Sequence, residues 1–180
     1  MNLDYTKEQF VERYTLIRDI ITVGKRPVPF PTAYILGGQP GAGKSRLQKQ
    51  IINNDRNCVI INADAFREYH PSFKYLQDTY GDESPTYTQP FINQVTEQLI
   101  SELSSKSYNL VVEGTLRTIN IPILTCNALK KKGYQVELHI VSVKKEISFA
   151  STVLRYEMLL SQGGIPAQGV RALRNTVPPL

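Results

Sequence analysis

The residues best suited to chemistry form one glycine-rich segment in the first half of the chain. It reads Gly38-Gln39-Pro40-Gly41-Ala42-Gly43-Lys44-Ser45 and fits the pattern G-x-x-x-x-G-K-[ST] at every fixed position. In such a loop the glycines let backbone N–H groups point inward at phosphate oxygens, and the following helix adds its positive N-terminal end. The pattern therefore predicts that residues 38–45 bind ATP and Mg²⁺, with Lys44 as a catalytic cation on the phosphates and Ser45 as a metal ligand.

A glycine-rich turn that contains a lysine by chance is the alternative interpretation of this segment. The neighbouring residues argue against it, because an apolar run at 33–36 precedes the loop and a helical pattern begins near Lys44. A strand before the loop and a helix after it are the context that a phosphate-binding loop requires.

Two carboxylates follow predicted strands and narrow the class of nucleotide-binding protein. Asp64 lies just beyond the apolar run at 58–61, and Glu113 ends the run that begins at Leu110. A kinase needs a carboxylate facing the γ-phosphate, where it accepts the proton of the attacking hydroxyl. Alternatives stay open for both residues, since Asp64 also suits the N-cap of a helix starting at Ala65, and Glu113 suits a solvated strand end.

Arginines that could stabilise a transferred phosphoryl group occur later in the chain. Arg117 follows Glu113 by four residues, and Arg155 lies in a predicted helix. Arg171 and Arg174 lie in a segment rich in glycine and proline. Spacing alone favours ordinary solvated charges for Arg117 and Arg155, although phosphoryl transfer does require a cation over the developing charge.

Short apolar runs alternate with helical patterns, which predicts an α/β fold. We expect a three-layer, P-loop kinase-like fold, with a mostly parallel sheet covered by helices on both faces and with ligands at the carboxyl ends of its strands. The expected strands are 33–36, 58–61, 110–112 and 134–142. The expected parts are an N-terminal helix and linker packing on the core at 1–30, a kinase domain at 31–160 and an irregular tail at 161–180.

Composition limits the classes of partner. The chain of 180 residues carries a net charge of +5 but no run of five basic residues, so we expect small anionic ligands and no nucleic acid. Lys130 to Lys132 suit the end of a helix, where cations complement the dipole. Cys58 and Cys126 show no metal-ligand spacing, and Cys58 is expected to be a small buried hydrophobe. The absence of a signal peptide and of a membrane-spanning run predicts a cytoplasmic protein without a membrane partner.

Four segments, in order and spacing, resemble the zeta toxin family of bacterial toxin–antitoxin systems. They are Leu36 to Ser45, Asn62 to Arg67 with His70-Pro71, Tyr108 to Thr118, and Leu154-Arg155-Tyr156-Glu157. The combination covers roughly residues 5–160 and is far more specific than the phosphate loop alone.

The resemblance implies a kinase that uses ATP to phosphorylate the sugar 3′-hydroxyl of UDP-N-acetylglucosamine and so poisons peptidoglycan synthesis. It implies that Asp64 is the general base, that Arg155 stabilises the phosphoryl group, and that Arg171, followed by Ala172, is the counterpart of a second catalytic arginine. It also implies an epsilon antitoxin as the protein partner. The residues that fall where the family contacts the UDP-sugar are Asp64, Glu97, Glu113, Thr115, Arg117 and Thr125.

Two other functions remain compatible with the sequence. One is a P-loop kinase of another small substrate or a nucleoside. The other is a truncated, inactive toxin domain that only binds antitoxin, which the divergent segment after Ser161 motivates.

Overall fold

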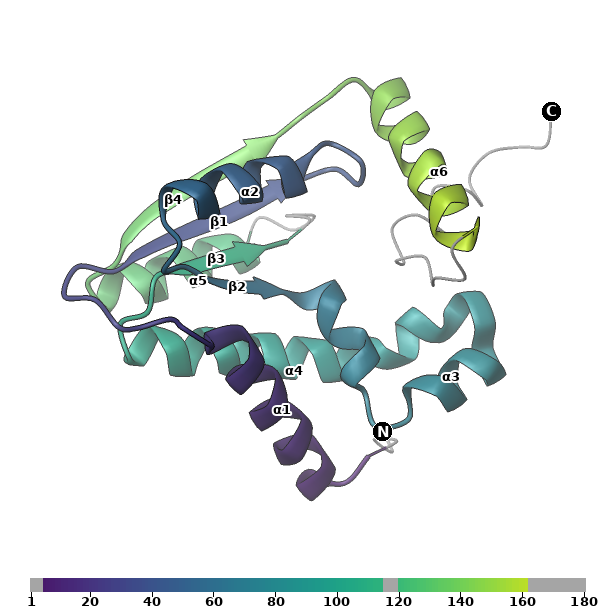
Figure 1. The fold of residues 1–180 in the computed structure, drawn as a ribbon, viewed down its shortest axis with the longest axis horizontal. Helices are drawn as coiled ribbons and strands as arrows, with labels where there is room; N and C mark the ends of the chain where they lie inside the picture. The colour runs from purple at the N-terminus through teal and green to yellow at the C-terminus, as the bar shows by residue number, and fades with distance from the viewer. Residues whose placement is uncertain (1–4, 115–119, 162–180) are drawn as a thin grey trace.

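A four-stranded parallel sheet forms the centre of the molecule (Figure 1). The computed structural model describes residues 5–114 and 120–161. The strand order is β2-β3-β1-β4, and every neighbouring pair is parallel. The bounds are β1 (Thr32–Gly38), β2 (Val59–Asn62), β3 (Leu110–Glu113) and β4 (Gln135–Val141). The predicted α/β class and the four predicted strands are therefore confirmed.

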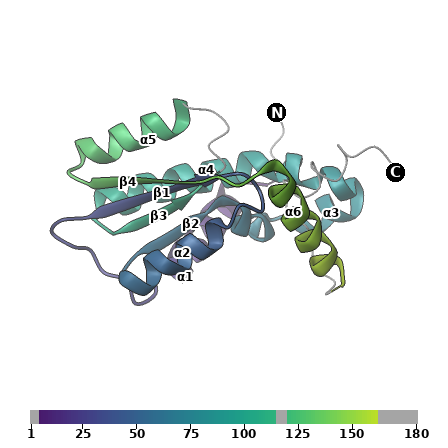
Figure 2. The ribbon, with the colours of Figure 1, turned by 90° about the horizontal axis from the view of Figure 1, so that it is seen from above.

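Helices connect the strands and cover both faces of the sheet, as Figure 2 shows from above. The α-helices are α1 (Lys7–Thr22), α2 (Lys44–Asn54), α3 (Phe73–Tyr80), α4 (Ser84–Ser105), α5 (Asn120–Lys131) and α6 (Lys145–Ser161). Two 3₁₀ helices, η1 (Ala63–Tyr69) and η2 (Gly81–Glu83), precede α3 and α4. Within the described residues, no helix combines the length and apolar character needed to cross a membrane.

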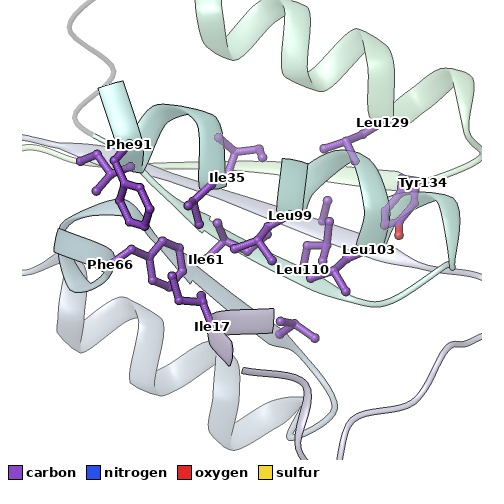
Figure 3. Packing of buried hydrophobic residues seen from close by; sticks show 14 of the residues in the cluster. Ile17, Ile35, Ile61, Phe66, Phe91, Leu99, Leu103, Leu110, Leu129 and Tyr134 are labelled. Atoms are coloured by element: carbon purple, nitrogen blue, oxygen red, sulfur yellow. The ribbon is translucent and has the colours of Figure 1, made fainter. Parts of the chain in front are cut away.

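Alternation along the strands divides the buried side chains between the two faces. Ala33 and Ile35 of β1 join the larger cluster with α1, α4 and α5, whereas Leu36 joins a smaller cluster under α2. The long helix α4 supplies the middle of the larger cluster with Phe91, Leu99 and Leu103 (Figure 3). The sheet is thus the middle of three layers, with its position fixed by apolar burial on both sides.

The first helix starts at a capping box, which Thr6 and Gln9 form. The Thr6 hydroxyl accepts a hydrogen bond from the Gln9 amide at 3.2 Å, and the Gln9 side chain accepts one from the Thr6 amide at 2.8 Å. Phe10 and Ile17 of this helix are buried in the larger cluster. Local capping therefore sets where α1 begins, and apolar burial sets where it packs.

Away from the site, two interpretations from the sequence agree with the structure. Cys58 is buried, and burial together with the adjacent Asp55 raises the pKa of its thiol to about 12. Both cysteines are free. Lys130 and Lys131 lie in the last turn of α5, where their charges complement the helix dipole.

Candidate active site

The phosphate loop joins β1 to α2 in backbone conformations that only glycine adopts freely. Gly41 has φ 72° and Gly43 has φ 98°, both in the left-handed region. Gly43 is the N-cap of α2, with no side-chain hydrogen bond to the first amides, and the first turn carries no acidic residue. The N-terminal end of α2 is therefore left with its positive dipole uncompensated, as an anion site requires.

Lys44 is folded back over this loop. Its Nζ donates to the carbonyl oxygens of Gly38 at 2.9 Å and Gln39 at 3.1 Å. Burial lowers the pKa of Lys44, the Arg155 charge lowers it further, and the carboxylates of Glu113 and Asp64 oppose this change. The ammonium group therefore lies within the loop and within electrostatic range of two acids and an arginine.

Helix α6 and the segment just before it contact the phosphate loop through side-chain hydrogen bonds and close backbone packing. The Gln39 amide donates to the Val143 carbonyl at 3.0 Å and accepts from the Val143 amide at 3.1 Å. The Ser148 hydroxyl donates to the Pro40 carbonyl at 2.7 Å. A Cβ at Gly41 would lie 2.6 Å from the Ser148 carbonyl oxygen, so glycine is also required here for space. The helix that carries Arg155 is thus positioned by the loop itself.

The first acid, Asp64, lies in the first turn of η1, directly after β2. The N-cap of η1 is Asn62, whose side chain accepts from the Asp64 amide at 3.1 Å. The alternative interpretation of Asp64 as an N-cap is therefore wrong, because the helix begins earlier, at Ala63. The Asp64 side chain is 55% exposed, which leaves its carboxylate accessible to a bound substrate.

The second acid, Glu113, ends the strand between β2 and β1. It pairs in register with Asn62 on one side and Leu36 on the other. Its Oε2 accepts from the Asn62 side-chain amide at 3.2 Å. Burial raises the pKa of Glu113, and Asp64 adds to this rise, while the Lys44 and Arg155 cations lower it. Glu113 is thus no simple solvated strand end.

These interactions bring four of the predicted residues together at the carboxyl edge of the sheet: Lys44, Asp64, Glu113 and Arg155. Glu97 lies exposed on α4, and Thr125 lies on α5 with its hydroxyl donating to the Ile121 carbonyl at 3.0 Å. In the part of the chain that the structure describes, neither makes a hydrogen bond or ion pair with those four. Thr115, Arg117, Arg171 and the tail from residue 162 lie outside the described residues.

One residue beside the site was assigned no role from the sequence. Arg67, one turn after Asp64, is buried and donates to the Asp64 carboxylate from two nitrogens. The same guanidinium group also donates to the Pro85 carbonyl and to the Thr88 and Gln89 side chains of α4. The available signal was an arginine three residues after an acid in a helix, a spacing that allows an ion pair but does not show burial.

Comparison with known proteins shows the family to which the chain belongs. A sequence model of the family described as "Zeta toxin" matches residues 17–176. The chain belongs to the zeta toxin family. "Toxin PezT" of Streptococcus pneumoniae serotype 4 is 43% identical over 162 residues, covering 87% of this chain and 62% of that protein. "Toxin zeta" of Streptococcus pyogenes is 36% identical over 167 residues, covering 92% of this chain and 58% of that protein.

Solved structures share the fold of this zeta toxin family member. A chain from a study of the PezAT chromosomal toxin–antitoxin system of Streptococcus pneumoniae superposes with a TM-score of 0.86 at 40% identity, covering 89% of this chain and 68% of that one. A chain of the AvrRxo1-ORF1:AvrRxo1-ORF2 complex with ATP reaches a TM-score of 0.52 at 17% identity, a likeness of fold alone. The chain spans about three fifths of the length of the curated relatives named above. The activity, substrates and partners of those longer toxins are therefore only proposed for this chain.

Magnesium is the metal that a phosphate loop of this family implies. In the described ranges, no three histidine, cysteine, aspartate or glutamate side chains gather as a metal site. A magnesium ion in a phosphate loop needs no such group, because it keeps water and phosphate oxygens as most of its ligands. The exposed Ser45 in the first turn of the uncapped α2 fits this requirement as the one protein hydroxyl.

Proposed function

We propose that this chain is an ATP-dependent kinase that transfers the γ-phosphoryl group to the sugar 3′-hydroxyl of UDP-N-acetylglucosamine or a related UDP-sugar. The observation that carries the proposal is the electrostatic coupling of Lys44 to both Asp64 and Glu113 at the end of the phosphate loop. A nucleotide switch needs a water-positioning group there, whereas an exposed carboxylate beside the phosphates suits a hydroxyl acceptor.

The donor side of the proposed reaction is made by the phosphate loop and α6. Loop amides and the end of α2 would hold the α- and β-phosphates, and Lys44 would exchange its two loop carbonyls for phosphate oxygens. Arg155 would stabilise charge on the transferred group, and Arg171 is proposed as the second such arginine. Magnesium, held through Ser45, would neutralise charge on the β- and γ-phosphates.

The acceptor side of the proposed reaction is made by the two acids. Asp64 takes the proton as the sugar hydroxyl oxygen bonds to phosphorus, and the bond from phosphorus to the bridging oxygen breaks to release ADP. Glu113 would accept a hydrogen bond from a substrate hydroxyl. The remaining proposed contacts to the UDP-sugar are Glu97, Thr115, Arg117 and Thr125.

The proposed biological setting is a cytoplasmic toxin that blocks cell-wall synthesis and is held inactive by an epsilon-type antitoxin. Support comes from the relatives, which are named as toxins, and from the study title of the similar chain, which names a toxin–antitoxin system. We also propose residues 31–160 as the catalytic unit, with residues 1–30 as a helix and linker packed on it and 161–180 as a tail. Phe10 and Ile17, buried with the sheet's own residues, support that division.

Replacing the base tests the proposal. Wild-type protein with ATP, Mg²⁺ and UDP-N-acetylglucosamine should yield a sugar nucleotide heavier by one phosphate in mass spectrometry. Asp64→Asn should reduce transfer by about 10³-fold or more while leaving ATP affinity intact, because the amide accepts no proton. Asp19→Asn is the matched control, since Asp19 is also an exposed aspartate paired with an arginine, on α1.

Other outcomes would redirect the proposal. Wild-type turnover of a different acceptor in a panel of nucleosides and sugar nucleotides would keep the kinase and change its substrate. Binding of both ATP and the UDP-sugar without turnover would favour a domain that only binds antitoxin. Full activity in Asp64→Asn would remove this residue from the mechanism.

A further inference from the structure

A buried arginine lies beside the proposed base and is used by no step described above. The Arg67 side chain is 11% exposed, whereas the Asp64 side chain that it contacts is 55% exposed. Burying a guanidinium group costs free energy of folding unless its N–H groups are hydrogen-bonded. The hydrogen-bond partners of Arg67 therefore indicate its role. Among the described residues, its hydrogen bonds run to the base on one side and to α4 on the other.

The contact with the base uses two donors and one acceptor. Nε of Arg67 donates to Oδ1 of Asp64 at 3.1 Å, and Nη2 donates to the same oxygen at 3.0 Å. Among the described residues, Oδ2 of Asp64 accepts no hydrogen bond. One carboxylate oxygen is therefore fixed, and the other is left for an acceptor hydroxyl.

The contact with α4 holds the guanidinium group in place. Nη1 donates to the Pro85 carbonyl at 2.8 Å and to the Thr88 hydroxyl at 2.9 Å, and Nη2 donates to Oε1 of Gln89 at 2.9 Å. The first turns of α4 thus fix the arginine, and the arginine fixes the carboxylate. An exposed aspartate without this link would exchange between rotamers and spend less time in a productive orientation.

We infer that Arg67 is a positioning residue, which orients the Asp64 carboxylate through Oδ1 and ties the base to the start of helix α4. This inference rests on the proposed function, in which Asp64 is the base. Arg67 acts only through Asp64 and touches no reacting atom. Helix α4 also carries Glu97, a proposed substrate contact two turns beyond Gln89, so the same helix carries an anchor of the base and a substrate-binding side chain.

The planar fork of arginine is what this arrangement requires. A lysine would keep one positive charge but has a single nitrogen, which cannot bind Asp64 Oδ1, the Pro85 carbonyl and Gln89 together in a fixed plane. Arg67→Lys therefore removes orientation and keeps charge, and Arg67→Gln removes both. Thr88→Val removes one anchor while leaving the arginine itself.

The test separates kcat from ATP affinity. Arg67→Lys should lower kcat for the UDP-sugar by about 100-fold and Arg67→Gln by more, with the Kd for ATP within about twofold of wild type, because the phosphate loop is intact. Thr88→Val should lower kcat about threefold to tenfold, which keeps the inference testable if Arg67→Gln does not fold. Unchanged kcat in Arg67→Lys and Thr88→Val would overturn the inference.

Arg18 offers a matched control. It binds Asp19 in the same way, with Nε at 2.9 Å and Nη2 at 2.7 Å from a single carboxylate oxygen, but on α1. Arg18→Lys should leave kcat unchanged. A loss of thermal stability in Arg67→Lys with unchanged kcat per ATP-binding molecule would show a merely structural role and overturn the inference.

A crystal structure of Arg67→Lys tests the role of Arg67 without any measurement of enzyme activity. The Asp64 carboxylate should be rotated from its wild-type position or occupy more than one rotamer, and an unchanged carboxylate would overturn the inference. This measurement keeps the two proposals distinct. If wild-type protein phosphorylates no UDP-sugar, the proposed function fails, and the position of Asp64 still decides the role of Arg67.

Discussion

The phosphate loop and the Asp64 region lie at the same edge of the sheet but are held by different kinds of contact. The loop depends on its backbone, since glycine conformations shape it and Lys44 binds the carbonyls of its own segment. Asp64 depends on side chains from elsewhere, through Arg67 and the residues of α4 that Arg67 binds. A site made of backbone is encoded locally, whereas a site made of side chains is encoded by several distant segments.

The same difference separates the two cations, Lys44 and Arg67. Lys44 is bonded to residues five and six positions away in the chain, whereas Arg67 reaches 18 to 22 positions to α4. Damage to the loop should therefore remove ATP binding and transfer together. Damage to the Asp64 region should remove transfer alone.

Within the phosphate loop, the largest effect is expected from removing its cation. Lys44→Ala should lower phosphoryl transfer by about 10³-fold and also weaken ATP binding, because the ammonium group serves the phosphates in both the bound and transition states. Steady-state kinetics and a fluorescent ATP analogue measure the two effects. Lys49→Ala, an exposed lysine on the same helix, is the control and should match wild type. Intact ATP binding in Lys44→Ala would contradict the expected difference between the phosphate loop and the Asp64 region.

A smaller effect is expected from adding one methyl group to the loop. Gly41→Ala combines a positive φ of 72° with a Cβ only 2.6 Å from the Ser148 carbonyl oxygen, so it should lower the free energy of unfolding by about 2–4 kcal/mol and weaken ATP binding. Gly24→Ala is the matched control, since φ is 68° and nothing lies within 4 Å of its Cβ. It should cost about 1–2 kcal/mol, the strain alone. Denaturant unfolding measures both, and equal costs would show that α6 does not press on the loop.

The smallest effect is expected on the pH dependence of stability, through Glu113. Burial raises the pKa of Glu113, against the opposing charges of Lys44 and Arg155. The folded state therefore favours the neutral carboxyl group, and this contribution is full below the ordinary glutamate pKa of about 4.3 and is lost as the pH rises through the higher folded-state value.

Glu113→Gln, which is neutral at every pH and can accept the same bond from Asn62, should be more stable than wild type at pH 7. The difference should vanish in acid, as thermal unfolding from pH 3.5 to 8 would show. A stability difference that grows in acid would contradict the assigned cause, the burial of the charged form.

Local patterns predicted the fold and the loop, because both rest on short-range rules. The Thr6 capping box and the strands ending at Gly38 and Glu113 follow from residue type and period. The same rules misplaced the N-cap at Asp64, since Asn62 two residues earlier caps a 3₁₀ helix instead. Spacing also gave no reason to favour Arg155, whose position beside Lys44 depends on how α6 packs against the loop.

Arg67 shows most clearly what short-range rules omit. Its partners Pro85, Thr88 and Gln89 lie beyond both α3 and η2 in the chain, so only the packing of α4 against η1 brings them together. The sequence predicted the acid and its class of chemistry. The residues that orient the acid required the tertiary structure.

Helix α4 both packs in the core and holds Arg67. Phe91, Val95 and Leu99 on one face are fully buried, and Gln89, which holds Arg67, lies in the same helix near its start. Because Gln89 is close in the chain to these core residues, a change of side-chain volume in the core would shift the end that anchors the base. Substitutions that improve packing under the sheet are thus not independent of activity. Evolution toward a more stable core must therefore keep the orientation of α4, because that helix also anchors the proposed base.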